Sequence, residues 1–161
     1  MKVIFLDIDG VLNSSNYFDE TSDVFYNYID YLDEKYELEK WLIQIDMNKL
    51  YLLKEIIDRT NSKVVVSSSW RNLKYYTFIE EYLINKGIPI IDTTKSLNNK
   101  RGLEIKTYLM EHPEITNYII IDDDIFPDYD EELLFNLIHT NFYNDGLNDD
   151  NYEDAIYKLK K

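Results

Sequence analysis

Two aspartates one residue apart follow an apolar run at the start of the chain. The run covers residues 3–6 and consists of β-prone residues, so we expect a strand that is buried on both faces. Asp7 and Asp9 lie where that strand ends, and alternate side chains of an extended segment point the same way. Gly10 permits a sharp turn directly after them. Two carboxylates held that close repel each other unless a cation lies between them or one keeps its proton. The spacing therefore predicts an acidic, cation-binding site.

Two further apolar runs end in polar groups in the same abrupt way. Residues 63–66 lead into three serines that begin with Ser67, and residues 118–121 lead into Asp122 and Asp123. In an open parallel sheet, ligands bind beyond the carboxyl ends of the strands. One such strand end is common in α/β proteins, so the prediction of a functional site depends on the coincidence of three.

The elements that position these groups alternate between strands and helices. We expect strands at residues 3–6, 63–66, 88–91 and 118–121, and a fifth within 133–140. We expect helices at residues 46–61, 73–86, 103–111 and 152–159. Pro89 suits an edge position for its strand. This alternation implies right-handed βαβ units, and hence an α/β fold with a central parallel sheet of about five strands flanked by helices. At 161 residues, we expect one domain that covers 1–161.

Residues 14–45 form a polar, acidic and aromatic segment with no clean period, although residues 24–42 suit one or two helices. The segment is too short for a large domain, so we expect at most a small cap or flap over the site. Its aromatic residues are Tyr17, Phe18, Phe25, Tyr26, Tyr28, Tyr31, Tyr36 and Trp41. Two interpretations stay open: these rings pack the segment onto the core, or one or two line the pocket and stack on a flat group.

Composition excludes several classes of protein. The chain has no cysteine, which excludes disulfides, thiolate zinc sites and cysteine nucleophiles. The net charge of -14 opposes broad binding to a phosphate backbone, although a local basic pocket is compatible with it. No stretch has the apolar length of a membrane span, and a strand begins at once with no signal peptide before it. We therefore expect a soluble cytoplasmic protein with no membrane contact and no stable protein partner.

The run KVIFLDIDGVLN resembles motif I of the haloacid dehalogenase (HAD) superfamily, the Mg-dependent phosphohydrolases that use an aspartate nucleophile. An EF-hand calcium loop would place Gly10 two residues later and would need a glutamate that is not here. The resemblance implies a HAD-like Rossmannoid fold. It also implies that Asp7 attacks a phosphomonoester to form an aspartyl-phosphate, and that Asp9 acts as general acid and base.

The run VVVSSSWR resembles motif II, a strand that ends in a serine or threonine bound to the phosphoryl group, and Ser67 takes that role in our interpretation. Arg71 either clamps a substrate oxygen or forms a surface ion pair. No GxSxG elbow accompanies the serines, which excludes a serine hydrolase. Motif III is a cation before the next strand. Lys100 and Arg101 occupy that interval, with the context of Arg101 closer to the family, and the other interpretation is a solvated basic pair.

The run IIIDDD resembles motif IV in its paired-aspartate form. The resemblance implies that Mg²⁺ is bound by Asp7, the Asp9 backbone carbonyl and Asp123, with Asp122 in support. Hard cations such as Mg²⁺ prefer oxygen ligands and keep several waters, so few carboxylates suffice. The acidic residues that follow are expected to form a solvated surface, and they are Asp124, Asp128, Asp130, Glu131 and Glu132.

A closer resemblance is to the small capless HAD domains of multidomain RNA repair proteins. It includes DGVLN, SSSWR, RGxEI and a later His-Thr followed by Gly-Leu, here His139, Thr140, Gly146 and Leu147. The resemblance implies a phosphorylated substrate, either a nucleotide or a nucleic-acid end, and a role in RNA repair. A small metabolite or a phosphoprotein is the alternative substrate. A catalytically silent module that binds a phosphorylated partner is the alternative of another class.

Overall fold

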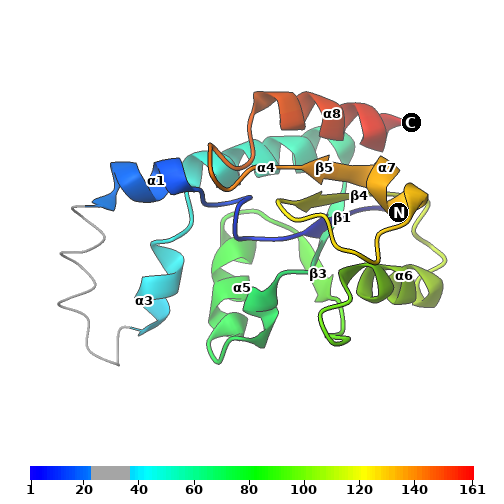
Figure 1. Cartoon of the computed structure of the whole chain (residues 1–161), viewed down its shortest axis with the longest axis horizontal. Helices are drawn as coiled ribbons and strands as arrows, with labels where there is room; N and C mark the ends of the chain where they lie inside the picture. Colours follow the sequence, from blue (N-terminus) through cyan, green and yellow to red (C-terminus); the bar gives the residue numbers. More distant parts are fainter. Residues whose placement is uncertain (23–36) are drawn as a thin grey trace.

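The computed structural model describes residues 1–22 and 37–161. Five parallel strands form one sheet in the order β3-β2-β1-β4-β5 (Figure 1). The strands are β1 (Lys2–Leu6), β2 (Lys63–Val66), β3 (Ile90–Thr93), β4 (Asn117–Asp122) and β5 (Leu137–His139). The helices are α1 (Ser15–Glu20), α3 (Glu37–Leu42), α4 (Met47–Thr60), the 3-10 helix η2 (Ser69–Asn72), α5 (Tyr76–Asn85), α6 (Arg101–Glu111), α7 (Glu131–Asn136) and α8 (Asp149–Lys160). The predicted α/β fold with a parallel sheet of five strands is confirmed.

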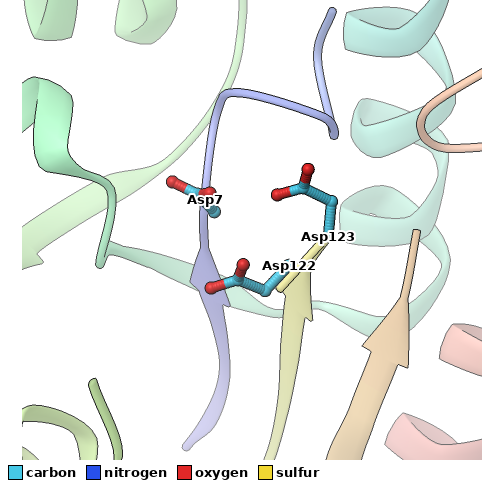
Figure 2. A group of neighbouring side chains, drawn as sticks. All are labelled: Asp7, Asp122 and Asp123. Atoms are coloured by element: carbon cyan, nitrogen blue, oxygen red, sulfur yellow. The ribbon is translucent and has the colours of Figure 1, made fainter. Parts of the chain in front are cut away.

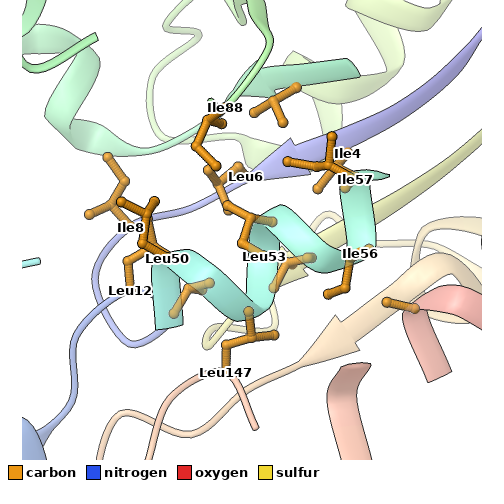
Figure 3. Packing of buried hydrophobic residues seen from close by; sticks show 14 of the residues in the cluster. Ile4, Leu6, Ile8, Leu12, Leu50, Leu53, Ile56, Ile57, Ile88 and Leu147 are labelled. Carbon is orange, nitrogen blue, oxygen red and sulfur yellow. The ribbon is translucent and has the colours of Figure 1, made fainter. Parts of the chain in front are cut away.

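The two faces of the sheet have separate hydrophobic cores because alternate strand residues point to opposite sides. Ile4 and Leu6 of β1 belong to a core that α4, α5 and α8 cover, and Val3 and Phe5 belong to one that α6 and α7 cover. Helix α4 lies along the first face, with its apolar stripe against β1 (Figure 3). Both faces of the sheet are therefore buried, and a functional site can lie at the carboxyl ends of the strands.

Helix α4 forms where the sequence supplies both end signals. The Asp46 side chain caps the first turn by accepting from the Asn48 N–H at 2.9 Å. Asn61 ends the helix in the left-handed conformation, with φ of 54°, and its N–H donates to the Ile57 carbonyl. Because these caps bound the predicted stripe of leucine and isoleucine, the predicted helix is present with the expected limits.

The limits of one predicted strand differ from the structure. The strand expected at 88–91 runs instead from Ile90 to Thr93, because Pro89 has no N–H and precedes the paired residues. This strand does lie at an edge of the sheet. The fifth strand lies within the predicted range 133–140, and it is limited to Leu137–His139 because helix α7 takes up Glu131–Asn136. Asp130 caps α7 by accepting from the Leu133 N–H, a signal that the apolar run obscured.

The segment 14–45 contains two described helices, α1 and α3, at one end of the molecule (Figure 1). The Tyr17 hydroxyl donates to the Ile43 carbonyl at 2.8 Å and so joins the start and the end of the segment. Trp41 of α3 packs against the core. Of the helices expected at 24–42, residues 24–36 lie outside the described residues, as do the aromatic residues Phe25, Tyr26, Tyr28, Tyr31 and Tyr36.

In the described part of the chain, every helix is too short or too polar to cross a membrane.

The buried face of α4 gives a direct test of the packing. Leu53 is fully buried between β1 and α8, whereas Tyr51 on the same helix is 58% exposed. We expect Leu53→Ala to lower the free energy of unfolding by about 2–5 kcal/mol, because it leaves a cavity in the core. Tyr51→Ala is the matched control and should change it by less than about 0.5 kcal/mol. Denaturant unfolding measures both, and equal effects would contradict the assigned faces.

Candidate active site

Three aspartates from two neighbouring strands converge at the carboxyl edge of the sheet (Figure 2). Leu6 of β1 is paired with Ile121 of β4, so the next residues, Asp7 and Asp122, emerge side by side. The Asp7 N–H donates to the Ile121 carbonyl at 2.9 Å and extends this pairing. Carboxylate oxygens of Asp7, Asp122 and Asp123 lie within 4.8 Å of one another. The parallel register therefore produces the cluster that the sequence predicted.

Burial makes this cluster hard to ionise. Asp122 is fully buried, and burial raises its pKa to about 8, with the neighbouring Asp7 adding to the effect. Burial also raises the pKa of Asp7, and it raises that of Asp123 to about 6. Arg101 and a hydrogen bond from Ser68 lower the pKa of Asp7 without cancelling the effect of burial. The fold therefore holds three carboxyls close together, where protonation or a bound cation would relieve their repulsion.

The donor set fits a hard divalent cation. Carboxylate oxygens at this separation match the ligands that Mg²⁺ prefers, and Mg²⁺ retains waters where protein ligands are few. The side chain of Asp9 is not part of the cluster, so only its backbone carbonyl remains as the ligand that the family resemblance implies. Asp7, Asp122 and Asp123 are the residues that fit such an ion.

Gly10 makes room for one carboxylate of this cluster. It has φ of +70°, and a Cβ at this position would lie 2.2 Å from Cγ of Asp123. Its N–H donates to the Asn13 side chain at 2.9 Å, and its carbonyl accepts from the Thr140 hydroxyl at 2.7 Å. Only glycine combines this backbone conformation with the close approach. The Asp-x-Asp-Gly turn is therefore shaped around Asp123.

The His-Thr and Gly-Leu pairs near the end of the sequence support the acidic loops. His139 Nε2 lies 2.8 Å from the Asp123 carbonyl oxygen, and the Thr140 N–H donates to the Asp122 carbonyl at 3.0 Å. At Gly146 a Cβ would lie 2.9 Å from the Val11 carbonyl oxygen, and the following Leu147 donates its N–H to that carbonyl. These backbone contacts explain the pattern, which sequence analysis found without assigning it a role.

Of the two predicted motif III cations, Arg101 lies in the site. Its side chain is 9% exposed, and its Nη1 lies 3.3 Å from Asp122 Oδ2 and 4.0 Å from Asp7 Oδ1. Its guanidinium lies over the Phe126 ring, 4.9 Å from the centroid. Lys100 is exposed, precedes α6 and does not line the pocket. The geometry therefore brings Arg101, and not Lys100, against the acidic cluster.

Arg71 is largely occupied by the protein itself. Its Nη1 donates to the carbonyls of Ser67 and Ser68 at 2.6 Å each, and its Nη2 forms a buried ion pair with Glu104 at 2.7 Å. Glu104 also lies 3.6 Å from Nε of Arg101. Of the Arg71 nitrogens, Nε alone has no hydrogen-bond partner among the described residues. The ion pair that sequence analysis placed at the surface is buried, and it holds the turn after β2 against α6.

The serines after β2 have different environments. Ser67 is fully buried, its hydroxyl has no hydrogen-bond partner among the described residues, and it does not line the pocket. Ser68 hydrogen-bonds to the Asp7 carboxyl and also caps η2 by accepting from the Trp70 N–H at 3.3 Å. The role of Ser67 in phosphate binding stays a prediction, and Ser68 is a second candidate that the sequence pattern did not single out. The direction of each hydroxyl depends on the turn, which has no local sequence signal.

Asp9 differs from Asp7 in that it is exposed, but its carboxylate is fixed by two side chains. Asn13 Nδ2 donates to Oδ1 at 2.9 Å, and Trp70 Nε1 donates to Oδ2 at 2.9 Å. The two aspartates of the first motif thus have distinct settings within one pocket.

The pocket above the cluster has a volume of about 400 Å³, within the range of small-molecule sites. Its charged lining consists of Asp7, Asp9, Arg71, Arg101, Glu104, Asp123 and Asp124. Its other lining residues are Ser69, Asn72, Asn99, Phe126 and Phe142. Apart from Asp7 and Asp9, all of these residues follow position 68, so the described part of segment 14–45 contributes none of them.

The acidic residues after motif IV are only partly the solvated surface that we expected. Glu131 and Glu132 are exposed, whereas Asp124 lines the pocket. Asp128 accepts from the Leu103 N–H in the first turn of α6, and Asp130 pairs with a lysine as well as capping α7. Two of the five therefore cap helices, because a carboxylate near a helix N-terminus is stabilised by free N–H groups.

The raised pKa values predict how stability depends on pH. Without a divalent cation, the folded chain retains protons on Asp122 and Asp123 that the unfolded chain releases near its usual pKa of 3.8. The stabilisation that these two groups contribute should therefore be largest below pH 4 and should be lost as pH rises to about 8. Mg²⁺ at a hundredfold excess over its Kd should restore about 2.7 kcal/mol, most clearly near pH 8.

Thermal unfolding from pH 4 to 8, with EDTA or with Mg²⁺, measures this dependence. Asp122→Asn should flatten the pH dependence seen in EDTA, and Asp19→Asn on the exposed face of α1 is its control. A Tm that rises with pH in EDTA, or that does not change when Mg²⁺ is added at pH 8, would refute the cluster as a cation site.

Comparison with known proteins agrees with this geometry. Residues 3–152 match the family described as the HAD domain in Swiss Army Knife RNA repair proteins. No curated protein and no solved structure matches the chain. The matched range contains all three strand ends and the His-Thr and Gly-Leu pairs that support them. The chain belongs to the HAD domain family of Swiss Army Knife RNA repair proteins.

Proposed function

We propose that the chain is a Mg-dependent phosphomonoester hydrolase that acts through an aspartyl-phosphate on Asp7. The observation that carries this proposal is the meeting of the buried Asp7 cluster, Arg101 and the exposed, fixed Asp9 in one pocket. Bound Mg²⁺ would offset negative charge on the phosphoryl oxygens and on Asp7. The family and the acidic cluster support the chemistry at this coarser level.

The two aspartates of the first motif divide the reaction between them. An Asp7 oxygen attacks phosphorus, the bond from phosphorus to the ester oxygen breaks, and Asp9 gives its proton to the leaving oxygen. Asp9 then takes a proton from water, which attacks the aspartyl-phosphate and releases inorganic phosphate with Asp7 regenerated. Asp9 is exposed, so it can exchange protons with the substrate and with water. Asp7 is buried, which keeps water away from the nucleophile.

The phosphate contacts follow from the same positions. Arg101 lies beside Asp7 and supplies positive charge to the equatorial oxygens. Ser68, beside Asp7, is better placed than Ser67 to donate to a phosphoryl oxygen. Arg71 has one N–H group, on the buried Nε, without a partner among the described residues, and its other contacts mainly position the turn. Lys100 stays outside the pocket, so it contributes only to the surrounding field.

We propose nucleotides or nucleic-acid ends as substrates. The pocket carries two half-buried rings, Phe126 and Phe142, and two neutral amides, Asn72 and Asn99. Rings stack on the faces of bases, and amides hydrogen-bond to their edges. The description of the family supports this substrate class.

The basic residues around the site do not form a continuous track for a phosphate backbone. Arg71 pairs with Glu104, Lys95 with Glu111, and Lys106 with Asp130. Because these three pairs offset the charge of their cations, we propose that the nucleotide that carries the phosphate is the main recognised element.

Asp7→Asn tests the proposed nucleophile. The amide cannot form the acyl-phosphate, so kcat should fall at least about a thousandfold. The fold should remain intact, because a neutral side chain relieves the repulsion that raises the pKa of Asp7 and Asp122. Phosphate release with Mg²⁺ and circular dichroism measure the two effects. Full turnover in a purified, folded variant would contradict the role of Asp7.

Phe142→Ala tests the nature of the substrate. We expect KM for a nucleoside monophosphate to rise roughly 5- to 150-fold, since stacking contributes about 1–3 kcal/mol per base. KM for glycerol phosphate, which has no ring, should change little. Phe78→Ala, an exposed ring on α5, is the control. Equal effects on both substrates would indicate that the ring does not contact a base.

A further inference from the structure

The general acid of the proposed reaction accepts a hydrogen bond from a buried tryptophan. Asp9 is exposed, so an unrestrained carboxylate there would rotate freely in water. Trp70 is 2% exposed, and its indole Nε1 donates to Asp9 Oδ2 at 2.9 Å. A buried ring that directs its single polar atom at an exposed carboxylate requires an explanation beyond core packing.

We propose that Trp70 is a positioning residue for Asp9 and that Trp41 of α3 holds Trp70 in place. This inference rests on the proposed function, because it assigns the support of the acid and base of that reaction. It extends the active site to residues that touch neither the substrate nor the cation.

Trp70 and Asn13 together determine the plane of the Asp9 carboxylate. Asn13 Nδ2 donates to Oδ1 at 2.9 Å, while its own oxygen accepts from the Gly10 N–H and so fixes the amide orientation. The indole N–H is only a donor, so it holds one oxygen whether the other bears a proton or not. With one neutral donor on each oxygen, the carboxylate cannot rotate without losing a charge-assisted hydrogen bond.

Trp41 connects helix α3 to this arrangement. The Trp41 and Trp70 rings meet edge to face, with centroids 5.2 Å apart and planes at 74°. Trp41 is partly buried against the same core that contains Trp70. Helix α3 follows residues 23–36 and ends segment 14–45, so this segment contributes to the site through the tryptophan pair, although its described residues do not line the pocket.

The position of a general acid matters because proton transfer requires heavy atoms about 2.6–3.2 Å apart in the reacting complex. Its benefit depends on the leaving group. An alkoxide leaving group needs the proton, whereas 4-nitrophenolate leaves readily without it. Loss of Asp9 positioning should therefore slow alkyl phosphates far more than aryl phosphates.

Trp70→Phe removes the N–H donor and keeps most of the ring. We expect kcat for a nucleoside monophosphate to fall roughly tenfold to a hundredfold, within the range of general acid catalysis. We expect kcat for 4-nitrophenyl phosphate to fall less than about threefold and KM for both substrates to stay within about twofold. Trp41→Ala should also slow the nucleoside monophosphate more than 4-nitrophenyl phosphate, with a smaller loss of kcat.

Tyr17→Phe is the matched control, since it removes another hydrogen bond of segment 14–45, the bond to the Ile43 carbonyl, and leaves Asp9 untouched. It should not alter the ratio of the two rates. Equal losses of kcat on both substrates in Trp70→Phe would indicate a structural role only, and unchanged rates would indicate no role. Either result overturns the proposal. A wild-type chain that hydrolyses neither substrate overturns the proposed function instead.

Fluorescence tests the contact without any turnover. The chain has two tryptophans, so Trp41→Phe leaves Trp70 as the single reporter. A carboxylate at the pyrrole edge stabilises the indole excited state, in which electron density moves to the benzene ring. Asp9→Asn in this background should therefore shift the emission to shorter wavelength, while Asp19→Asn should not. Identical spectra for Asp9→Asn and its parent would overturn the contact, whether or not the protein is an enzyme.

Discussion

The structure depends on one electrostatic constraint, the crowding of three carboxyls at adjacent parallel strand ends. Leu6 and Ile121 are in register, so the next residues along β1 and β4 must share one space. Among the described residues, the ion pairs of this cluster are with Arg101, whose Nη1 lies 3.3 Å from Asp122 and 4.0 Å from Asp7. Glu104 lies against that same arginine. Ionisation of all three carboxyls would leave negative charge in excess, which a divalent cation could balance.

This excess explains why so much of the chain supports the acidic loops. A repelling cluster would spread apart unless its backbone were fixed, and the fixing contacts come from distant parts of the sequence. The Thr140 hydroxyl holds the Gly10 carbonyl, and the loop around Gly146 lies against the backbone of Val11. On the other side, the ion pair between Arg71 and Glu104 joins the turn after β2 to α6. These contacts hold the backbone around the acidic cluster in place.

Local patterns in the sequence predict the fold and the acidic cluster well, because apolar strands and capped helices have short-range signals. They do not predict the direction of a side chain where that direction depends on a turn or on residues that are distant in the sequence. No local signal separates Ser67 from Ser68, or shows that Arg71 is buried against Glu104. The same limit left the fifth strand placed only within 133–140, since α7 and β5 share one apolar run. The contact of Trp70 with Asp9 spans 61 positions and was not foreseen.

Asp7 and Asp9 show how position alone separates two identical side chains. Asp7 continues β1 and is enclosed by neighbouring strand ends, so burial raises its pKa, while Arg101 and a hydrogen bond from Ser68 lower it. Asp9 lies in the turn, open to the pocket, where Asn13 and Trp70 hold it from the sides. Two carboxyls with different environments suit different protonation roles. A strand that ends one residue later would bury both and remove the distinction, so the length of β1 is itself part of the chemistry.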